Sequence, residues 1–99
     1  MTPLPINLQP HAEEEARSAR RWYTQGNSEA GERFMAELDR AIQAISEFPE
    51  RWPRYLHDTR RLHLHRFPYW VVYRVKPESV LIVAVAHDRR RPGYWRSRK

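Results

Sequence analysis

The stretch VLIVAVAHDRRRPGYW, residues 80–95, decides how the rest of the chain must fold. Its first seven residues, Val80–Ala86, are apolar without alternation, which is typical of a central strand covered on both faces. Three arginines, a Pro-Gly break and two aromatic residues follow directly. We therefore predict a buried strand that ends in a dense group of cations and aromatic rings.

Two helices are predicted upstream of this strand. The first begins at Pro10, a residue suited to the first helical turn, and is stopped by Gly26-Asn27. The second has Ser28 as its predicted N-cap and ends before Pro49. It carries the widest apolar stripe in the chain, formed by Phe34, Leu38, Ala41, Ile42, Ile45 and Phe48. The two-residue loop predicts an antiparallel hairpin.

Three further strands are predicted around Val80–Ala86. Pro3–Gln9 has the alternation and prolines of an edge strand, and Tyr69–Val75 is rich in β-branched and aromatic residues. Arg60–Phe67 alternates, with Leu62 and Leu64 on one face and Arg61, His63 and His65 on the other. Residues 49–55 are expected to be an irregular connector. The predicted fold is α+β, in the order β-α-α-β-β-β, with an antiparallel helical hairpin packed on a largely antiparallel four-stranded sheet, and residues 1–99 form one domain.

The composition excludes several classes of protein. The chain has no cysteine, which excludes disulfides and thiolate metal sites and fits a cytoplasmic location. No apolar run approaches the ~20 residues that a membrane span requires. The N-terminal sequence lacks the pattern of a secretory signal, so none is expected. We therefore expect a cytoplasmic protein without membrane contact.

Charge is distributed unevenly along the chain. Residues 1–59 contain 7 Lys and Arg against 10 Asp and Glu, whereas residues 60–99 contain 11 against 2. The net charges of −3 and +9 give the overall +6. An asymmetry of this size predicts that the C-terminal part faces an anionic partner.

The sequence lacks the residue patterns that most catalytic mechanisms require. His63 and His65 share a strand face, and His57 and His87 could approach them, but no metal-ligand spacing is present. The three glycines form no phosphate cradle, and the helix carboxylates have the spacing of a solvated face. We expect no metal and no cofactor.

One cluster of basic and aromatic residues remains as a candidate site. It consists of Arg60, Arg61, His63, His65, Arg66, Arg74, His87, Arg89, Arg90, Arg91, Tyr94 and Trp95. Arginine forks bind phosphates, and rings stack on unpaired bases. A metal-free ribonuclease needs only such cations and a proton carrier, either a histidine or a tyrosine or arginine of lowered pKa. An acidic protein partner, or a merely solvated basic surface, fits the same residues.

Three segments resemble the RelE/ParE toxins of type II toxin–antitoxin systems, often called plasmid stabilisation proteins. They are PERWPRY at residues 49–55, RRLHLHRFPYWVVYRV at residues 60–75 and VAVAHDRRRPGYW at residues 83–95. The resemblance spans about Ile6 to Trp95 and implies the same β-α-α-β-β-β order. It also implies a bacterial toxin in a hetero-oligomer with its cognate antitoxin. The antitoxin's acidic and apolar C-terminal segment would cover the toxin, and operator DNA would be bound only through the antitoxin.

The resemblance leaves two mechanisms open. ParE-like members inhibit DNA gyrase, whereas RelE-like members cut mRNA on the ribosome with strand arginines and a C-terminal tyrosine. Carried over to this chain, the nuclease residues would be His87, Arg89 and Tyr94, but Trp70 replaces the third-strand arginine. We therefore expect gyrase inhibition, with the endonuclease as the alternative and a non-toxic antitoxin-binding protein as a third possibility. The residues expected to bind target or antitoxin are Arg61, His63, His65, Arg74, Arg90, Arg91 and Trp95.

Overall fold

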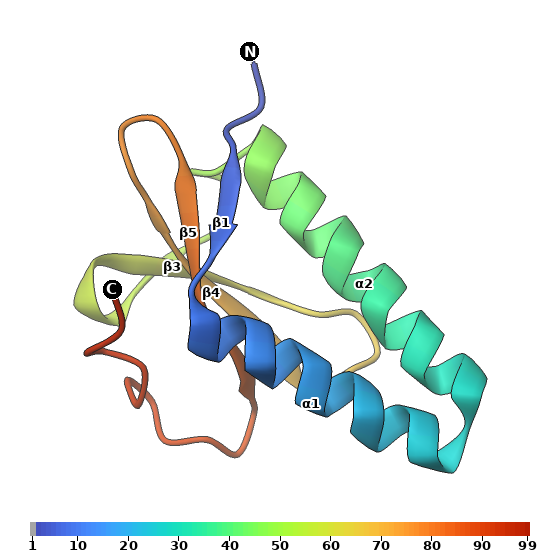
Figure 1. Ribbon diagram of the computed structural model, residues 1–99. Coiled ribbons are helices and arrows are strands. Elements are labelled where there is room, and N and C mark those ends of the chain that lie inside the picture. Colours follow the sequence, from blue (N-terminus) through green and yellow to red (C-terminus); the bar gives the residue numbers. More distant parts are fainter. Residues whose placement is uncertain (1) are drawn as a thin grey trace.

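Helices α1 (Pro10–Gly26) and α2 (Ser28–Glu47) form an antiparallel hairpin in the computed structural model, which describes residues 2–99 (Figure 1). Pro10 lies in the first turn of α1, where its missing N–H has no helical partner to lose. The side-chain oxygen of Gln9 caps this helix by accepting a hydrogen bond from the backbone N–H of His11 at 2.7 Å. The predicted start of the first helix is therefore confirmed.

The turn between the helices is shorter than the sequence predicts. Asn27, not Ser28, is the N-cap of α2, and its side-chain oxygen accepts a hydrogen bond from the N–H of Glu29 at 2.9 Å. Gly31 lies at a close contact between the two helices, because a Cβ atom there would come 2.0 Å from Oγ1 of Thr24. The prediction of Ser28 as N-cap is thus wrong by one residue, since the extended backbone of Asn27 alone makes the turn.

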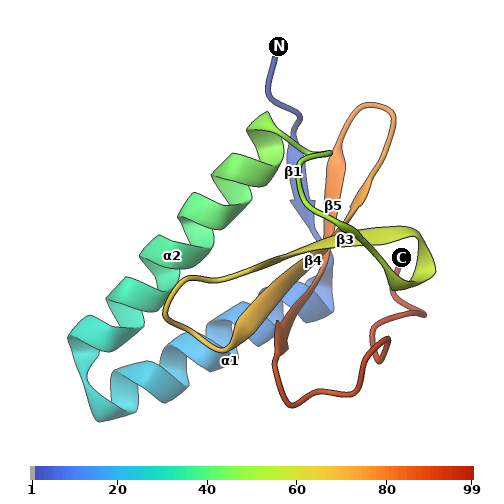
Figure 2. The ribbon, with the colours of Figure 1, turned by 180° about the vertical axis from the view of Figure 1, so that it is seen from behind.

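The sheet has five strands in the order β1-β5-β4-β3-β2. These are β1 (Ile6–Leu8), β2 (Arg54–Tyr55), β3 (Thr59–His63), β4 (Tyr69–Val75) and β5 (Val80–His87). Figure 2 shows β1, β5, β4 and β3 from behind. β1 runs parallel to β5, and all other pairs are antiparallel. The α+β class and the largely antiparallel sheet are confirmed, with one strand more than predicted.

Two strand predictions need correction. The connector contains β2, whose two residues are too few to show a strand periodicity in sequence and which pairs only with β3. β3 ends at His63 and not at Phe67, because the chain turns through residues 64–68. Arg66 in this turn has a positive φ of 75°, and the N–H of Leu64 donates to the carbonyl of Tyr69 at 2.9 Å. The predicted strand is too long because the alternation of apolar and polar residues continues into the turn.

The main core lies between the helical hairpin and the sheet. Phe34, Leu38 and Ile45 of the predicted stripe are fully buried, whereas Phe48 is the C-cap of α2 and is half exposed, because the helix ends before it. α1 contributes a row of alanines that lets it lie close to β5. Tyr73 on β4 is also fully buried, and its hydroxyl donates to the carbonyl of Pro49 at 2.7 Å. Burial raises the pKa of this hydroxyl to about 12. The main members of this core are Ala12, Ala16, Ala19, Phe34, Leu38, Ile45, Val71, Tyr73, Ile82 and Val85.

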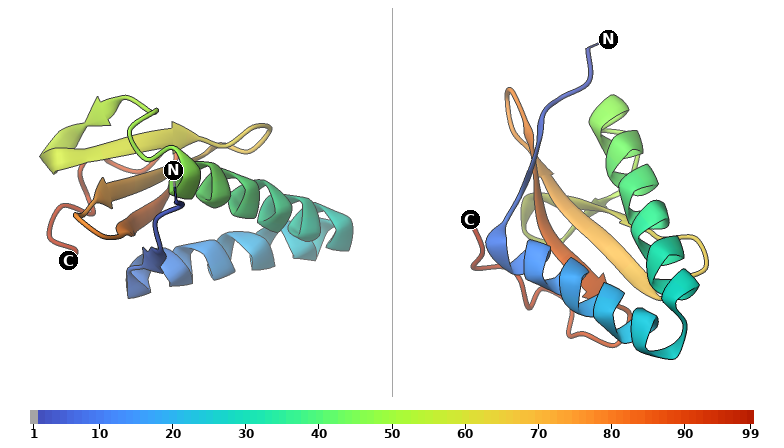
Figure 3. Two further views of the ribbon diagram at one scale, coloured as in Figure 1. Left: turned by 90° about the horizontal axis from the view of Figure 1, so that it is seen from above. Right: turned by 45° about the vertical axis from the view of Figure 1, so that its right-hand side comes forward.

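The opposite face of the sheet is covered by the C-terminal segment (residues 88–99), which follows β5 (Figure 3). A bulge in β5 prepares this face: Val72 pairs with Ala84 and Tyr73 with Ile82, so Val83 is an extra residue. Val83 and Ala84 consequently pack together under Trp95, in a second apolar cluster. Both faces of β5 are buried, as its apolar sequence predicts.

Candidate interaction site on the basic face

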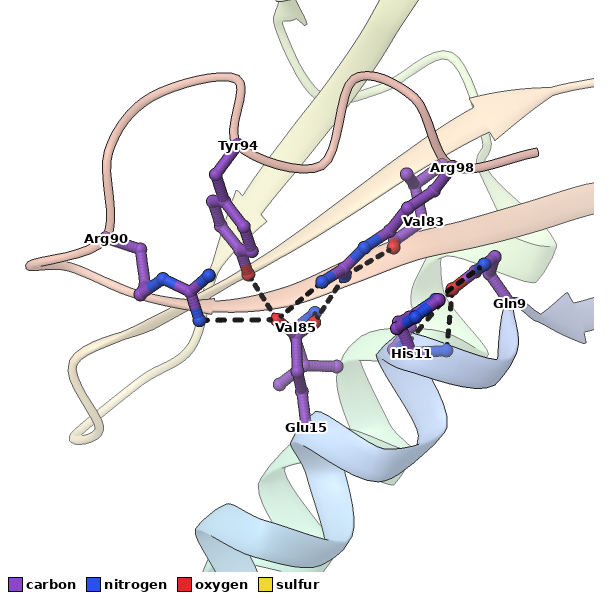
Figure 4. A network of polar contacts seen from close by, with 9 residues as sticks. Gln9, His11, Glu15, Val83, Val85, Arg90, Tyr94 and Arg98 are labelled. Atoms are coloured by element: carbon purple, nitrogen blue, oxygen red, sulfur yellow. Dashed lines mark hydrogen bonds and ion pairs between the residues drawn. The ribbon is translucent and has the colours of Figure 1, made fainter.

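One carboxylate on α1 holds the C-terminal segment against β5 (Figure 4). Glu15 accepts hydrogen bonds from the hydroxyl of Tyr94 at 2.5 Å and from the guanidinium of Arg98 at 2.8 and 3.2 Å. It also accepts the backbone N–H of Val85 at 3.0 Å. Because β1 pairs with β5 only through Ile82, this N–H has no strand partner, and Glu15 supplies the missing acceptor. We call this group the Glu15 anchor.

The hydroxyl of Tyr94 is a fixed donor. Burial and the hydrogen bond to Glu15 both raise the pKa of Tyr94 well above its usual value. Its ring also lies beneath the guanidinium of Arg90, 3.8 Å from the ring centre. A tyrosine of lowered pKa is one of the proton carriers considered from the sequence, and Tyr94 shows the opposite shift. In this structure Tyr94 is an internal anchor rather than a free proton acceptor.

Trp95 is buried and does not present an exposed ring. Only 1% of its surface is accessible, and it packs on the second apolar cluster. The rings of Tyr55 and His57 lie 6.0 and 5.8 Å from it, centre to centre. Gly93, with a φ of +78°, makes the turn that directs the indole inward. The sequence-based expectation of a surface-binding indole is therefore corrected: Trp95 stabilises the fold, because its large apolar area covers the sheet.

The three consecutive arginines point to different environments. Arg90 turns toward the Glu15 anchor, with a nitrogen 3.9 Å from the carboxylate. Arg89 and Arg91 are exposed, and their side chains form no ion pair within residues 2–99. The backbone N–H of Arg89 donates to Nδ1 of His87 at 3.0 Å, so that nitrogen of His87 is an acceptor. Arg89 and Arg91 are thus free cations at the start of this segment.

A second basic group lies on β3 and β4. The guanidinium of Arg61 is clamped between two rings, 3.8 Å from the ring centres of both Tyr55 and Trp70. His63, directly opposite Trp70 in the ladder, packs against its ring at 4.6 Å. Nε2 of His63 lies 3.0 Å from the carboxylate of Asp88 and joins β3 to the C-terminal segment. We call Arg61, Tyr55 and Trp70 the arginine clamp.

Two predicted site residues lie apart from this group. His65 is exposed in the turn after β3, beside Arg40 of α2. Arg74 donates to the backbone carbonyl of Arg98 at 2.9 Å, so it supports the C-terminal segment. The single cluster expected from the sequence is thus divided among the arginine clamp, the C-terminal segment and the β3–β4 turn. Sequence reasoning did not identify Glu15, Tyr55 and Trp70 as site residues. The one available signal was the alternation of β3 and β4, which indicates that Trp70 shares a sheet face with Arg61.

A groove of about 440 Å³ opens between α1 and the end of β5. Ala19, Tyr23 and Tyr69 line it, and its polar residues are Glu15, Ser18, His87 and Arg90. Trp22 also lines the groove and is 68% exposed, the most exposed of the large apolar side chains in residues 2–99. A large exposed ring beside a concave apolar surface is typical of a protein-binding site.

Metal-binding groups and membrane-spanning helices are two further features to consider in the described residues. Residues 2–99 contain no group of three or more His, Cys, Asp or Glu side chains placed to hold a metal ion. No helix in the same range is long and apolar enough to span a bilayer.

The fold and this face define a small basic α+β protein with a helical hairpin on one side of its sheet and an arginine-rich segment on the other. Comparison with known proteins identifies the family to which this chain belongs. The family model described as the ParE toxin of type II toxin–antitoxin system, parDE, matches residues 6–92. The chain belongs to this family of ParE toxins, and the predicted RelE/ParE resemblance is confirmed.

A solved structure shows the same fold. The chain titled as part of the chromosomal ParDE toxin–antitoxin system from P. aeruginosa superposes with a TM-score of 0.76 at 13% sequence identity. The match covers 88% of this chain and 98% of that chain. No curated protein matches the sequence.

Proposed function

We propose that this ParE-family toxin inhibits DNA gyrase by binding it, and that a cognate antitoxin holds it inactive in a cytoplasmic hetero-oligomer. The observation that carries the proposal is the state of Tyr94, whose hydroxyl is held by Glu15 and whose pKa is raised. A nuclease mechanism that used Tyr94 as its proton carrier would need this hydroxyl to be free. Binding a protein target requires only a shaped and charged surface.

The residue at the third-strand position supports the same choice. Trp70 stands where the RelE resemblance would require an arginine, and its ring is already covered by Arg61. Arg89 and His87 remain near each other through the hydrogen bond between the N–H of Arg89 and Nδ1 of His87. The endonuclease alternative therefore depends on these two residues alone.

The groove beside Trp22 supports an antitoxin with an acidic and apolar segment. Apolar side chains could enter between Ala19, Tyr23 and Tyr69, and a carboxylate could pair with Arg90, which also lines the groove. The unequal charge of the two parts of the chain fits an acidic partner. Operator DNA would then be contacted by the antitoxin and not by this chain.

The first experiment measures supercoiling by purified gyrase in the presence of micromolar toxin of confirmed fold. We expect inhibition by the wild type, and weaker inhibition by Arg89→Gln/Arg91→Gln, since both side chains are exposed and without ion pairs. Arg20→Gln/Arg33→Gln, two exposed arginines on the helices, has the same charge change and is the matched control. Normal supercoiling with folded wild-type protein would refute the proposal.

The alternatives have separate readouts. Ribosome-dependent transcript cleavage that disappears in Arg89→Ala would replace gyrase inhibition by the endonuclease mechanism. Normal growth during expression without an adjacent partner gene would favour a non-toxic antitoxin-binding protein. For the antitoxin site, Trp22→Ala should weaken binding of the proposed cognate antitoxin by about tenfold or more, as exposed aromatic anchors do at interfaces. Phe48→Ala, which removes a 50% exposed ring outside the groove, should leave that affinity unchanged.

A further inference from the structure

Arg61 differs from every other half-buried arginine in residues 2–99. Three such arginines have partners: Arg60 donates to the carbonyls of Glu50 and Trp52, Arg74 to that of Arg98, and Arg98 to Glu15 and Val83. The side chain of Arg61 has neither a hydrogen bond nor an ion pair, although it is similarly withdrawn from solvent. A guanidinium carries five N–H donors and stays charged at all physiological pH values. Arg61 therefore holds unused donors at a fixed position.

The rings of the clamp determine how those donors can be used. Tyr55 and Trp70 cover the guanidinium at 3.8 Å each, so a ligand can approach only its N–H edge. That edge is the fork that binds a planar oxyanion with two parallel hydrogen bonds. Stacking has already restricted the side chain, which reduces the entropy lost when a ligand binds. The arrangement is a preformed receptor for one oxyanion.

The neighbours of the clamp favour a carboxylate over a nucleic acid. Trp70 already contacts His63 in addition to Arg61, and Tyr55 has Trp95 as a further neighbour. The rings thus serve to hold the guanidinium and do not form the open platform on which single-stranded bases stack. The carboxylate of Asp88 lies beside this face and is engaged by His63 and not by Arg61. The receptor therefore remains open to an external acidic group.

We propose that the arginine clamp binds a glutamate or aspartate side chain of an acidic protein segment, so that Arg61 is a specificity-determining contact for the partner. This inference rests on the acidic antitoxin proposed above and locates one of its contacts on the sheet face, apart from the Trp22 groove. The groove involves α1, the end of β5 and the start of β4, whereas the clamp involves β2, β3 and β4. The two surfaces therefore meet at β4, where Tyr69 lines the groove and the adjacent Trp70 belongs to the clamp.

The test uses the Nε–Hε resonance of Arg61 in the wild-type protein, observed by NMR. The probes are an acetylated and amidated hexaglutamate peptide and hexauridylate RNA. We expect the peptide to shift the Arg61 resonance in a saturable manner and to bind Arg61→Lys about tenfold more weakly, because a lysine keeps the charge but loses the two-pronged fork. Arg54→Lys, an exposed neighbour on β2, should change the affinity less than twofold.

Each possible result of this test either supports or overturns the proposed role of the arginine clamp. No shift of the Arg61 resonance with either probe, or equal losses in Arg61→Lys and Arg54→Lys, would overturn the proposal. Tighter binding of hexauridylate through Arg61 would replace it with a nucleic-acid contact. The supercoiling assay is independent of this readout: gyrase inhibition with no peptide binding would reject the clamp and retain the proposed function. Peptide binding without gyrase inhibition would retain the clamp as an oxyanion receptor and reject gyrase inhibition.

Discussion

Replacing Glu15 with alanine tests the account of how the C-terminal segment is held. The substitution removes the acceptor of the Val85 N–H, and an unsatisfied buried N–H costs about 1–3 kcal/mol. It also leaves Arg98, whose side chain is 13% exposed, without its carboxylate. Removing one partner of a fully buried pair costs about 3–5 kcal/mol. Because Arg98 keeps the carbonyl of Val83 and some solvent contact, we expect a combined loss of about 3 kcal/mol.

Urea unfolding followed by circular dichroism measures this loss. With an m-value of about 1.5 kcal/mol/M, the midpoint should fall by about 2 M. Glu13→Ala is the control on the same helix, because Glu13 pairs with Arg17 at the surface, where both side chains are 54% exposed, and should hardly move the midpoint. If Glu15→Ala lowered the midpoint no further than Glu13→Ala, the anchor would contribute no stability and the reasoning would be refuted.

A double-mutant cycle separates the ion pair from the rest of the anchor. Glu15→Gln, Arg98→Met and the double variant should show a coupling of about 1–3 kcal/mol, in the range measured for residues in direct contact. Hydrogen exchange on the same variants should show faster exchange in residues 88–99 before the helices are affected, since the anchor fastens that segment. If hydrogen exchange became faster by the same factor across the whole chain, Glu15 would contribute to global stability and would not fasten this segment specifically.

Three other outcomes follow from buried positions. Trp95→Ala should lower the free energy of unfolding by about 3–5 kcal/mol in urea denaturation, because the removed indole is 1% exposed; a loss below 1 kcal/mol would mean that the segment is not packed in solution. Gly31→Ala should destabilise despite a helix-propensity gain of about 1 kcal/mol, since its Cβ would meet Thr24, whereas Gly26→Ala meets nothing within 4 Å and should be neutral or stabilising in thermal melts. Above the ordinary tyrosine pKa of 10.0 and up to about pH 12, stability should fall with rising pH, because the unfolded chain loses the proton that Tyr73 retains when folded. Tyr73→Phe should make that alkaline slope shallower by one proton, and an unchanged slope would contradict the raised pKa of Tyr73.

Local chemistry explains which elements could be predicted. Pro10 marks the start of α1 and Pro49 follows closely after the end of α2, since proline is tolerated in a first turn and disfavours helix in the residue before it. The bounds predicted for Tyr69–Val75 agree with β4. The apolar run at Val80 predicted the central strand. Each of these signals acts within a few residues, so it can be read without knowledge of the fold.

The candidate site could be predicted only in part. The arginines and rings were found by composition, but their division into separate groups was not. Glu15 meets Tyr94 and Arg98 across 79 and 83 residues of chain, a separation at which sequence carries no pairing signal. Tyr55 reaches Arg61 because a two-residue strand turns the connector onto the sheet. These contacts exist only after the sheet has formed.

The amino-acid sequence by itself determined the α+β class, the helical hairpin, the central buried strand and the excess of positive charge after residue 60. The tertiary structure alone decided which of those charges are used internally and which remain for a partner. Arg98 and Arg74 became internal because the C-terminal segment folds back over the sheet, whereas Arg61, Arg89 and Arg91 kept their donors free. The physical reason is that the environment of a side chain depends on distant segments packed around it, and nearest-neighbour sequence does not encode that packing.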